Sequence, residues 1–108
     1  MIFHITAQSA WQVAQAEGTY QAPSLKTEGF IHFSTESQVV ATANRFYRGK
    51  TDLVLLSVEP SRLKPELRYE DTASHGTFPH LYGPLNLDAV VDVRLFSPDA
   101  DGQFSAQS

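Results

Sequence analysis

The chain has 108 residues, of which 42% are hydrophobic, so it is long enough for one domain and too short for two. It contains no cysteine, which excludes disulfides, thiolate nucleophiles and cysteine-type zinc sites. The formal net charge is −4 and the eight basic residues are scattered, which argues against a surface that binds nucleic acid.

The N-terminal third is predicted to form a strand, a helix, a loop and a second strand. Ser9 and Gln12 have the Ser-x-x-Gln spacing of a capping box, which predicts a helix that begins near Ala10. Alanine-rich sequence carries this helix to Glu17, and Gly18 supplies the C-terminal stop. The first strand, the connecting loop and the second strand are expected at residues 1–5, 19–28 and 30–34.

The middle of the chain predicts a helix and a central strand. A second capping box, at residues 35–38, opens a helix over residues 36–48 whose apolar residues recur with helical spacing. Gly49 ends this helix. The near-continuous apolar segment 52–58 predicts a strand that is buried on both faces. The apolar stripe of the helix consists of Val39, Ala43, Phe46 and Tyr47.

The C-terminal half predicts two strands separated by a polar loop and a stiff loop. The last strand alternates in polarity, with Val91, Val93 and Leu95 on one face. The stiff loop contains two prolines and a glycine among aromatic residues. In chain order, the strand, polar loop, stiff loop and last strand are expected at residues 67–70, 71–77, 78–84 and 89–96.

These elements predict a single α+β domain, with two helices packed on a bent or split, mostly antiparallel sheet. A pure α/β sheet would need a helix after each strand, whereas the second half of this chain supplies none. The domain is expected to span residues 1–96, followed by a polar, frayed tail at residues 97–108.

Membrane attachment and export are not expected. The longest apolar run, residues 53–56, is far too short to span a bilayer. The N-terminus enters the first strand directly, without the basic, apolar and cleavable regions of a signal peptide. We therefore expect a cytoplasmic protein with no membrane partner, and its oligomeric state is left open.

Two histidines lie in the middle of predicted strands. His4 shares a strand face with Ile2. His32 shares a strand face with Phe30 and Ser34. If these faces meet, they form a pocket for a small ligand with two titratable rings. The alternative is that each imidazole is buried and bonded to a backbone carbonyl.

A third histidine, His80, lies in the stiff loop together with Tyr82. Stiff loops beside a sheet often line sites, so both residues are candidate ligand-binding residues, although the loop could instead cover a sheet edge. Tyr20 and Ser24 could offer hydroxyl groups to a phosphate, although their residue types also suit an ordinary loop. Ser34, beside His32, completes this set of candidates.

Metal binding and serine hydrolysis have weaker support. The four histidines, Glu70 and Asp71 could supply metal ligands, but no histidine pair has the i, i+4 spacing of a zinc-protease helix and no H-x-H occurs, so no metal is expected. Ser34 and His32 lie two positions apart on a strand, about 7 Å, which is too far for a good hydrogen bond. The chain also lacks a G-x-S-x-G nucleophile elbow.

Several ordered motifs resemble those of a known family. They include F-H-I-T near the N-terminus, then E-G-F-I-H-F-S, D-L-V-L-L and finally F-P-H-L-Y-G-P-L. Over about residues 2–96, the chain resembles the small bacterial family known only as domain of unknown function 952. This resemblance implies no established activity.

The layout is more distantly similar to the ADP-ribosyltransferase-like fold, which includes the RNA 2′-phosphotransferases. His4 matches the first-strand histidine of that fold, and His32 in I-H-F-S looks like the second-strand histidine of the phosphotransferases. The helix expected over residues 36–48 follows the same plan. The late-strand acid of the fold has no clear match, and Glu70 is the nearest carboxylate.

The distant resemblance implies NAD, ADP-ribose or another phosphate-bearing compound as the ligand. His4 would orient the ribose, and His32 or Tyr20 would flank the nicotinamide. Glu70 would stabilise the positive charge that develops on the ribose as the bond breaks. The chain lacks paired carboxylates and an activated nucleophile, which favours binding over catalysis.

Three interpretations therefore remain open. The first is an enzyme of the ADP-ribosyltransferase-like or phosphotransferase-like kind. The second is a non-catalytic ligand-binding module in which the histidines only position the ligand. The third is a structural or interaction protein whose histidines belong to the core. A structure separates them by showing whether the three imidazoles line one opening.

Overall fold

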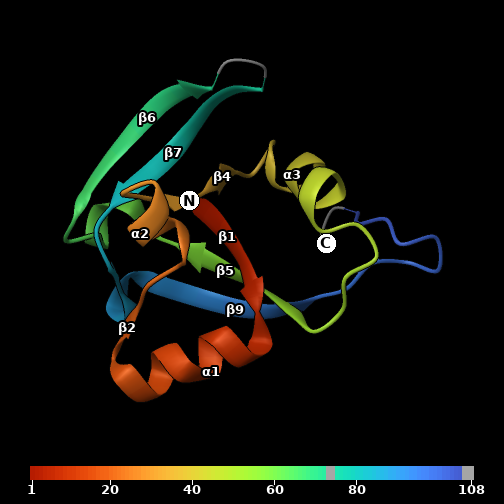
Figure 1. The fold of residues 1–108 in the computed structure, drawn as a ribbon, viewed down its shortest axis with the longest axis horizontal. Helices are drawn as coiled ribbons and strands as arrows, with labels where there is room; N and C mark the ends of the chain where they lie inside the picture. Colours follow the sequence, from red (N-terminus) through yellow and green to blue (C-terminus); the bar gives the residue numbers. More distant parts are fainter. Residues whose placement is uncertain (73–74, 106–108) are drawn as a thin grey trace.

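The computed structural model describes residues 1–72 and 75–105, which form an α+β domain with mostly antiparallel sheets (Figure 1). The larger sheet has the order β4–β1–β5–β9, with β1 at Ile2–Ala7, β4 at Ser34–Thr35, β5 at Leu53–Val58 and β9 at Val90–Phe96. A second sheet has the order β3–β7–β6, with β3 at Ile31–His32, β6 at Glu66–Thr72 and β7 at Gly76–Tyr82. A short ribbon pairs β2 (Thr19–Tyr20) with β8 (Leu85–Asn86).

The described residues contain three α-helices instead of the two expected. They are α1 (Gln8–Glu17), α2 (Ser24–Thr27) and α3 (Val39–Phe46), and two 3₁₀ turns lie at Pro60–Arg62 and Leu87–Ala89. Both α2 and β2 fall in the segment expected to be a loop. The helix α2 was missed because a single turn is too short to show an apolar period.

Of the two predicted ends of the first helix, the C-terminal end is correct and the N-terminal end is wrong. At the C-terminus, Gly18 adopts φ 85°, and its N–H donates to the carbonyl of Ala14 at 2.8 Å, as the stop signal predicted. At the N-terminus, the helix begins at Gln8, after Ala7, and no side chain caps it. The predicted cap at Ser9 is therefore wrong, because β1 runs directly into the helix.

The segment 30–34, predicted as one strand, changes sheets at Phe33. β3 pairs with β7 in one sheet, and β4 pairs with β1 in the other. Between them, the backbone N–H of Phe33 donates to the carbonyl of Pro79 at 3.0 Å. His32 is exposed and Ser34 is buried, so the single strand face predicted for these two residues is not formed.

The stiff loop predicted at residues 78–84 is in fact mostly strand β7. β7 lies between β3 and β6, and Pro79 is accommodated because it lies opposite Phe33, just past the end of β3, so the N–H that proline lacks falls outside the β3–β7 ladder. The expected polar loop is also shorter, since β6 continues to Thr72 and β7 begins at Gly76. Residues 73–74 of that loop lie outside the described residues.

Strand β5 is central and buried, as predicted, with β1 on one side and β9 on the other. Its two faces build two apolar cores. Leu56 packs with Trp11 of α1 in one core, and Leu55 packs with Ala43 of α3 and Phe96 in the other. These cores hold β1 rigidly between α1 and α3, and β1 carries His4.

Residues 97–105 differ from the frayed tail that the sequence predicts at residues 97–108, and residues 106–108 of that tail lie outside the described residues. Phe104 is buried and its ring stacks on Phe96, with 4.7 Å between ring centroids. Asn44 bonds the Phe104 backbone twice: its side-chain amide donates to the carbonyl at 3.1 Å, and its Oδ1 accepts the N–H at 2.7 Å. Because the segment is polar overall, its composition did not indicate that Phe104 packs into the core.

Among the described residues, no helix is both long enough and apolar enough to cross a bilayer.

Candidate functional site

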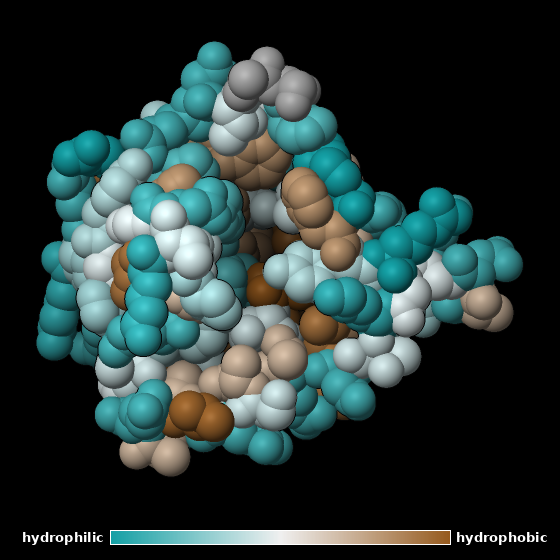
Figure 2. Space-filling model, in the orientation of Figure 1, coloured by the Kyte–Doolittle hydropathy of each residue, from teal (hydrophilic) through white to brown (hydrophobic). Residues whose placement is uncertain are grey.

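A cleft of about 690 Å³ opens between α3 and the part of the second sheet formed by β3 and β7. Figure 2 shows it as a hollow with hydrophobic side chains inside and polar ones around it. Its volume lies in the range of roughly 300–1,000 Å³ that is usual for small-molecule sites. Side chains from β1, α2, β3, α3 and β7 line it, so it depends on the whole fold.

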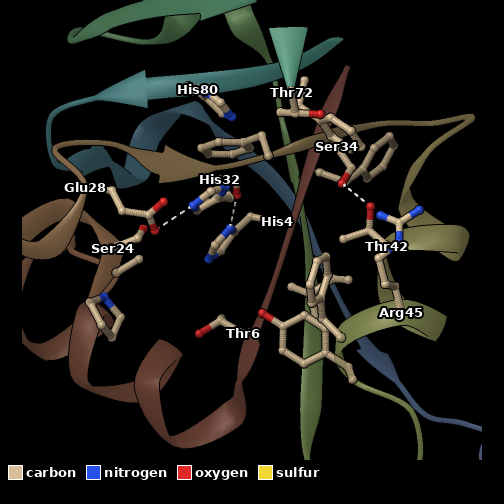
Figure 3. A pocket seen from close by; sticks show the side chains of 18 of the residues that line it. His4, Thr6, Ser24, Glu28, His32, Ser34, Thr42, Arg45, Thr72 and His80 are labelled. Carbon is tan, nitrogen blue, oxygen red and sulfur yellow. Dashed lines mark hydrogen bonds and ion pairs between the residues drawn. The ribbon is translucent and has the colours of Figure 1, made fainter. Parts of the chain in front are cut away.

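The three strand histidines all line this cleft, and Figure 3 shows His4, His32 and His80 on one side of it with Arg45 on the other. His32 and His80 are cross-strand partners on β3 and β7, and their ring centroids are 5.3 Å apart in an edge-to-face arrangement. His4 reaches them from β1 through a bond to the His32 backbone.

Both ring nitrogens of His4 have partners within the protein. Nδ1 lies 2.6 Å from the carbonyl oxygen of His32, and because a carbonyl only accepts, Nδ1 carries the hydrogen. Nε2 lies 2.8 Å from the hydroxyl of Tyr20, and that hydroxyl lies 3.0 Å from Oγ1 of Thr6. Sequence reasoning raised this alternative of a satisfied core histidine, but it could not identify Tyr20 as the second partner.

Burial is the main cause of the low pKa of His4, which falls from 6.5 to about 4. His4 is therefore neutral at pH 7, and its Nε2 must accept a hydrogen bond from the Tyr20 hydroxyl. Thr6 then donates to the Tyr20 oxygen, which completes a chain from Thr6 through Tyr20 and His4 to the His32 carbonyl. Burial likewise raises the pKa of Tyr20, which stays protonated.

His32 presents its ring to solvent at the edge of the cleft. Its Nε2 lies 3.0 Å from a carboxylate oxygen of Glu28, just after α2, and both side chains are about half exposed. An exposed pair of this kind contributes little to stability. The pair does set the direction of the ring, which lies against Phe30 and His80.

His80 is buried, and a carboxylate fixes its orientation. Its Nδ1 lies 2.9 Å from Oε1 of Glu70 on the neighbouring strand β6, and the Tyr82 hydroxyl donates to the same oxygen. Hydrogen bonds from Tyr82 and then His80 lower the pKa of Glu70, so it is ionised at pH 7. The Glu70 carboxylate therefore keeps a hydrogen on Nδ1 of His80.

The second nitrogen of His80 has no partner. Within the described residues, this Nε2 is the one buried side-chain nitrogen or oxygen that makes no hydrogen bond. The ring of Phe30 packs on His80 with centroids 4.0 Å apart, which helps to cover it. A buried polar atom without a partner costs about 1–3 kcal/mol, so the unpaired nitrogen of His80 needs an explanation.

The opposite side of the cleft carries positive charge. Arg45 and Lys50 line it, and neither forms an ion pair with a described residue. Their charged groups lie over the exposed ring of Phe46 and the ring of Tyr47, at 5.6 and 5.8 Å from the ring centroids. In a chain with net charge −4, two cations without acidic partners at one cleft favour an anionic ligand.

The remaining predicted site residues are placed as follows. Tyr20, Ser24 and Ser34 line the cleft, but the hydroxyl of Ser24 donates to the carbonyl of Phe30 at 2.7 Å, and that of Ser34 donates to Thr42 at 3.2 Å. Glu70 and Tyr82 do not line the cleft and lie behind His80.

Sequence reasoning missed Thr42, Arg45, Phe46 and Lys50 as lining residues. Arg45 and Lys50 lie near the C-terminal end of a helix, where cations are favoured, and this is a sufficient reason for them when the fold is unknown. Thr42, Arg45 and Phe46 follow the i, i+3, i+4 spacing of one helix face, and this mixed polar and aromatic face was the available signal.

No group of three or more histidine, aspartate or glutamate side chains in residues 1–72 and 75–105 is arranged to hold a metal ion.

The fold and the cleft together define a small α+β protein with a histidine-lined cleft. The family model described as "Protein of unknown function (DUF952)" matches residues 5–93, so the chain belongs to this family.

Solved structures extend the comparison. The chain is similar to the crystal structure of protein CC0527 from Caulobacter crescentus, a structural genomics target, with 35% identity, a TM-score of 0.88, and coverage of 96% of this chain and 92% of that one. The solution structure of the same protein gives 35% identity, a TM-score of 0.84, and coverage of 96% and 90%. No curated protein matches. The ADP-ribosyltransferase-like layout finds no support in these similarities and stays an expectation.

Proposed function

We propose that the cleft binds a small phosphate-bearing compound with an aromatic ring, such as ADP-ribose or a related nucleotide. The observation that carries this proposal is the unpartnered Nε2 of His80, a residue that lines the cleft. Because this nitrogen is buried beside the ring of Phe30, the ligand must displace that ring to reach it. A ligand group that bonds this nitrogen removes the cost of leaving it unpaired, and it gains a partner that Glu70 has already oriented.

The charges of the cleft support the phosphate part of the proposal. Arg45 and Lys50 are free of ion pairs with the described carboxylates, so they can bond phosphate oxygens without breaking an existing ion pair. The exposed ring of Phe46 and the ring of Phe78, which also line the cleft, offer surfaces on which a base or nicotinamide ring can pack.

The same geometry argues against NAD cleavage by the residues that the distant resemblance assigns. His4 has no free ring nitrogen to orient a ribose, and Glu70 lies behind His80 with one oxygen already accepting two hydrogen bonds. We therefore propose binding and derive no cleavage step. In this proposal His4 is a positioning residue, which fixes the His32 backbone at the edge of the cleft.

A structural role for the histidines is the second candidate. The observation that favours it is the complete hydrogen bonding of His4. Under this alternative, the cleft binds none of the tested compounds and the His32–His80 pair serves only to join β3 to β7.

Isothermal titration with ADP-ribose, NAD, ADP and inorganic phosphate tests the proposal. We expect at least one nucleotide to bind, and Arg45→Gln to weaken its affinity by about tenfold, because a charge-assisted hydrogen bond is worth roughly 1.5–3 kcal/mol. The matched control is Arg48→Gln, three residues along, which is exposed and does not line the cleft. If no nucleotide binds, or if the two variants bind equally, the proposal is wrong.

A further inference from the structure

The strand β9 leaves an edge of the larger sheet without a partner. Among the described strands it pairs with β5 alone, so the backbone groups on its other side face outward. Unpaired edges of this kind are templates for pairing with another chain. Proteins usually protect such edges with charges, bulges or a covering element.

One face of this edge strand is apolar and exposed. The side chains of Val91, Val93 and Leu95 are 43%, 39% and 66% exposed. They alternate as the sequence predicts, but they are not buried, because α1 packs mainly over β1 and β5. The other face carries Asp92 and Arg94, both about half exposed, with an ion pair of 2.7 Å between them.

We propose that two copies of this chain pair through β9 in an antiparallel manner, about a two-fold axis at Val93. Directly opposed residues in an antiparallel pair lie on the same face of the sheet. In this register Val93 meets Val93 of the second copy, and Val91 meets Leu95 of the second copy. The apolar side chains of both copies then form one continuous stripe.

The charges select this register over its neighbours. With the axis at Val93, Asp92 of each copy lies opposite Arg94 of the other, which gives two favourable pairs. Moving the axis to Asp92 places the two Asp92 carboxylates opposite each other, and moving it to Arg94 opposes the two guanidinium groups. Like charges directly opposite destabilise a strand pair, so only the central register is complementary.

The contact is small, which determines how it must be measured. A register shift between Ser57 and Val58 places a bulge at Val91, so the regular part of the two-fold ladder is limited to residues 92–94, and Val91 meets Leu95 at its bulged ends. A strand pair of this length lies below the roughly 1,200 Å² of stable complexes. The dimer is therefore weak and depends on protein concentration.

Sedimentation equilibrium of the full-length chain over a wide range of protein concentrations tests the proposal. We expect a reversible monomer–dimer equilibrium, which Arg94→Asp weakens by about tenfold or more because it makes both cross-strand pairs repulsive. The double variant Asp92→Arg with Arg94→Asp restores both pairs and should restore dimerisation. Because this double variant also restores the pair within each chain, the discriminating sample is an equimolar mixture of Arg94→Asp with Asp92→Arg, which places opposite charges together only between the two chains and should dimerise.

The matched control is Arg68→Asp, which disrupts the Arg68–Glu66 pair on β6, an exposed ion pair on the edge strand of the second sheet. It should leave the dimer unchanged. A chain that stays monomeric at every concentration overturns the proposal, as does a dimer that Arg94→Asp leaves intact.

Discussion

His4 and His80 are both buried imidazoles, but the protein uses them differently. Both ring nitrogens of His4 bond to partners within the protein, whereas His80 bonds through one nitrogen and its other nitrogen has no partner among the described residues. The difference follows from position: His4 on β1 lies between the β3 backbone and Tyr20, while His80 on β7 bonds the Glu70 carboxylate and is packed against the ring of Phe30 at the cleft.

Stability should decrease in mild acid because of His4. Its pKa is about 4 in the folded chain and 6.5 in the reference state, so between these pH values the unfolded chain binds the additional proton. The stabilisation is complete above about pH 6.5 and is lost as the pH falls toward 4, by about 3 kcal/mol at most.

Urea unfolding of the parent and of His4→Gln near neutral pH and near pH 5 checks this expectation. The acid-induced loss of unfolding free energy should be clearly smaller in His4→Gln. The control is His75→Gln, which removes an exposed histidine and should keep the full dependence on pH. Equal slopes for the parent and His4→Gln would mean that His4 is not held neutral by burial.

At the scale of single residues, the sequence predicted that His4 and His32 lie on strands but not which partners each one has. Strand periodicity placed His4 and His32 correctly in β1 and β3. It could not show that a sheet change at Phe33 would expose His32, because that change depends on pairing with β7, far away in the sequence. Arg45 reaches the cleft because α3 packs beside it, which no local pattern in the sequence predicts.

Among the elements, those with long periodic patterns were predicted well and short or non-local ones were not. The central strand β5 followed from its apolar run, and α1 ends at Gly18 as expected. α2 has a single turn and β7 contains a proline, so neither shows the local pattern of its class. Their structure comes from tertiary pairing, which overrides local preference.

The segment after β9 is an element whose packing can be tested directly. Phe104→Ala should destabilise the fold by about 3 kcal/mol, because it removes a buried ring from the core that contains Phe96 and Ala43. Gln103→Ala, at the exposed neighbouring position, should change stability by less than about 0.5 kcal/mol. The free energy of unfolding in urea distinguishes them, and equal values would show that this segment does not pack in solution.

In the whole molecule, the cleft arises because two sheets share one crossing segment. β3 and β4 follow each other along the chain but belong to different sheets, and the junction brings His32 and His80 beside β1. α3 closes the other side and brings Arg45 and Phe46. The α+β class could be predicted from the order of elements, but the cleft could not, since it depends on the angle between the sheets.

The central claim is that the free nitrogen of His80 meets a phosphate-bearing ligand in this cleft. The most direct measurement is a titration of ¹⁵N-labelled chain with ADP-ribose, followed through the imidazole ¹⁵N resonances. The account predicts saturable changes at Nε2 of His80 and at His32, with His4 unchanged because both of its nitrogens are already bonded. Resonances of His80 and His32 that stay unchanged up to saturating ADP-ribose would contradict it.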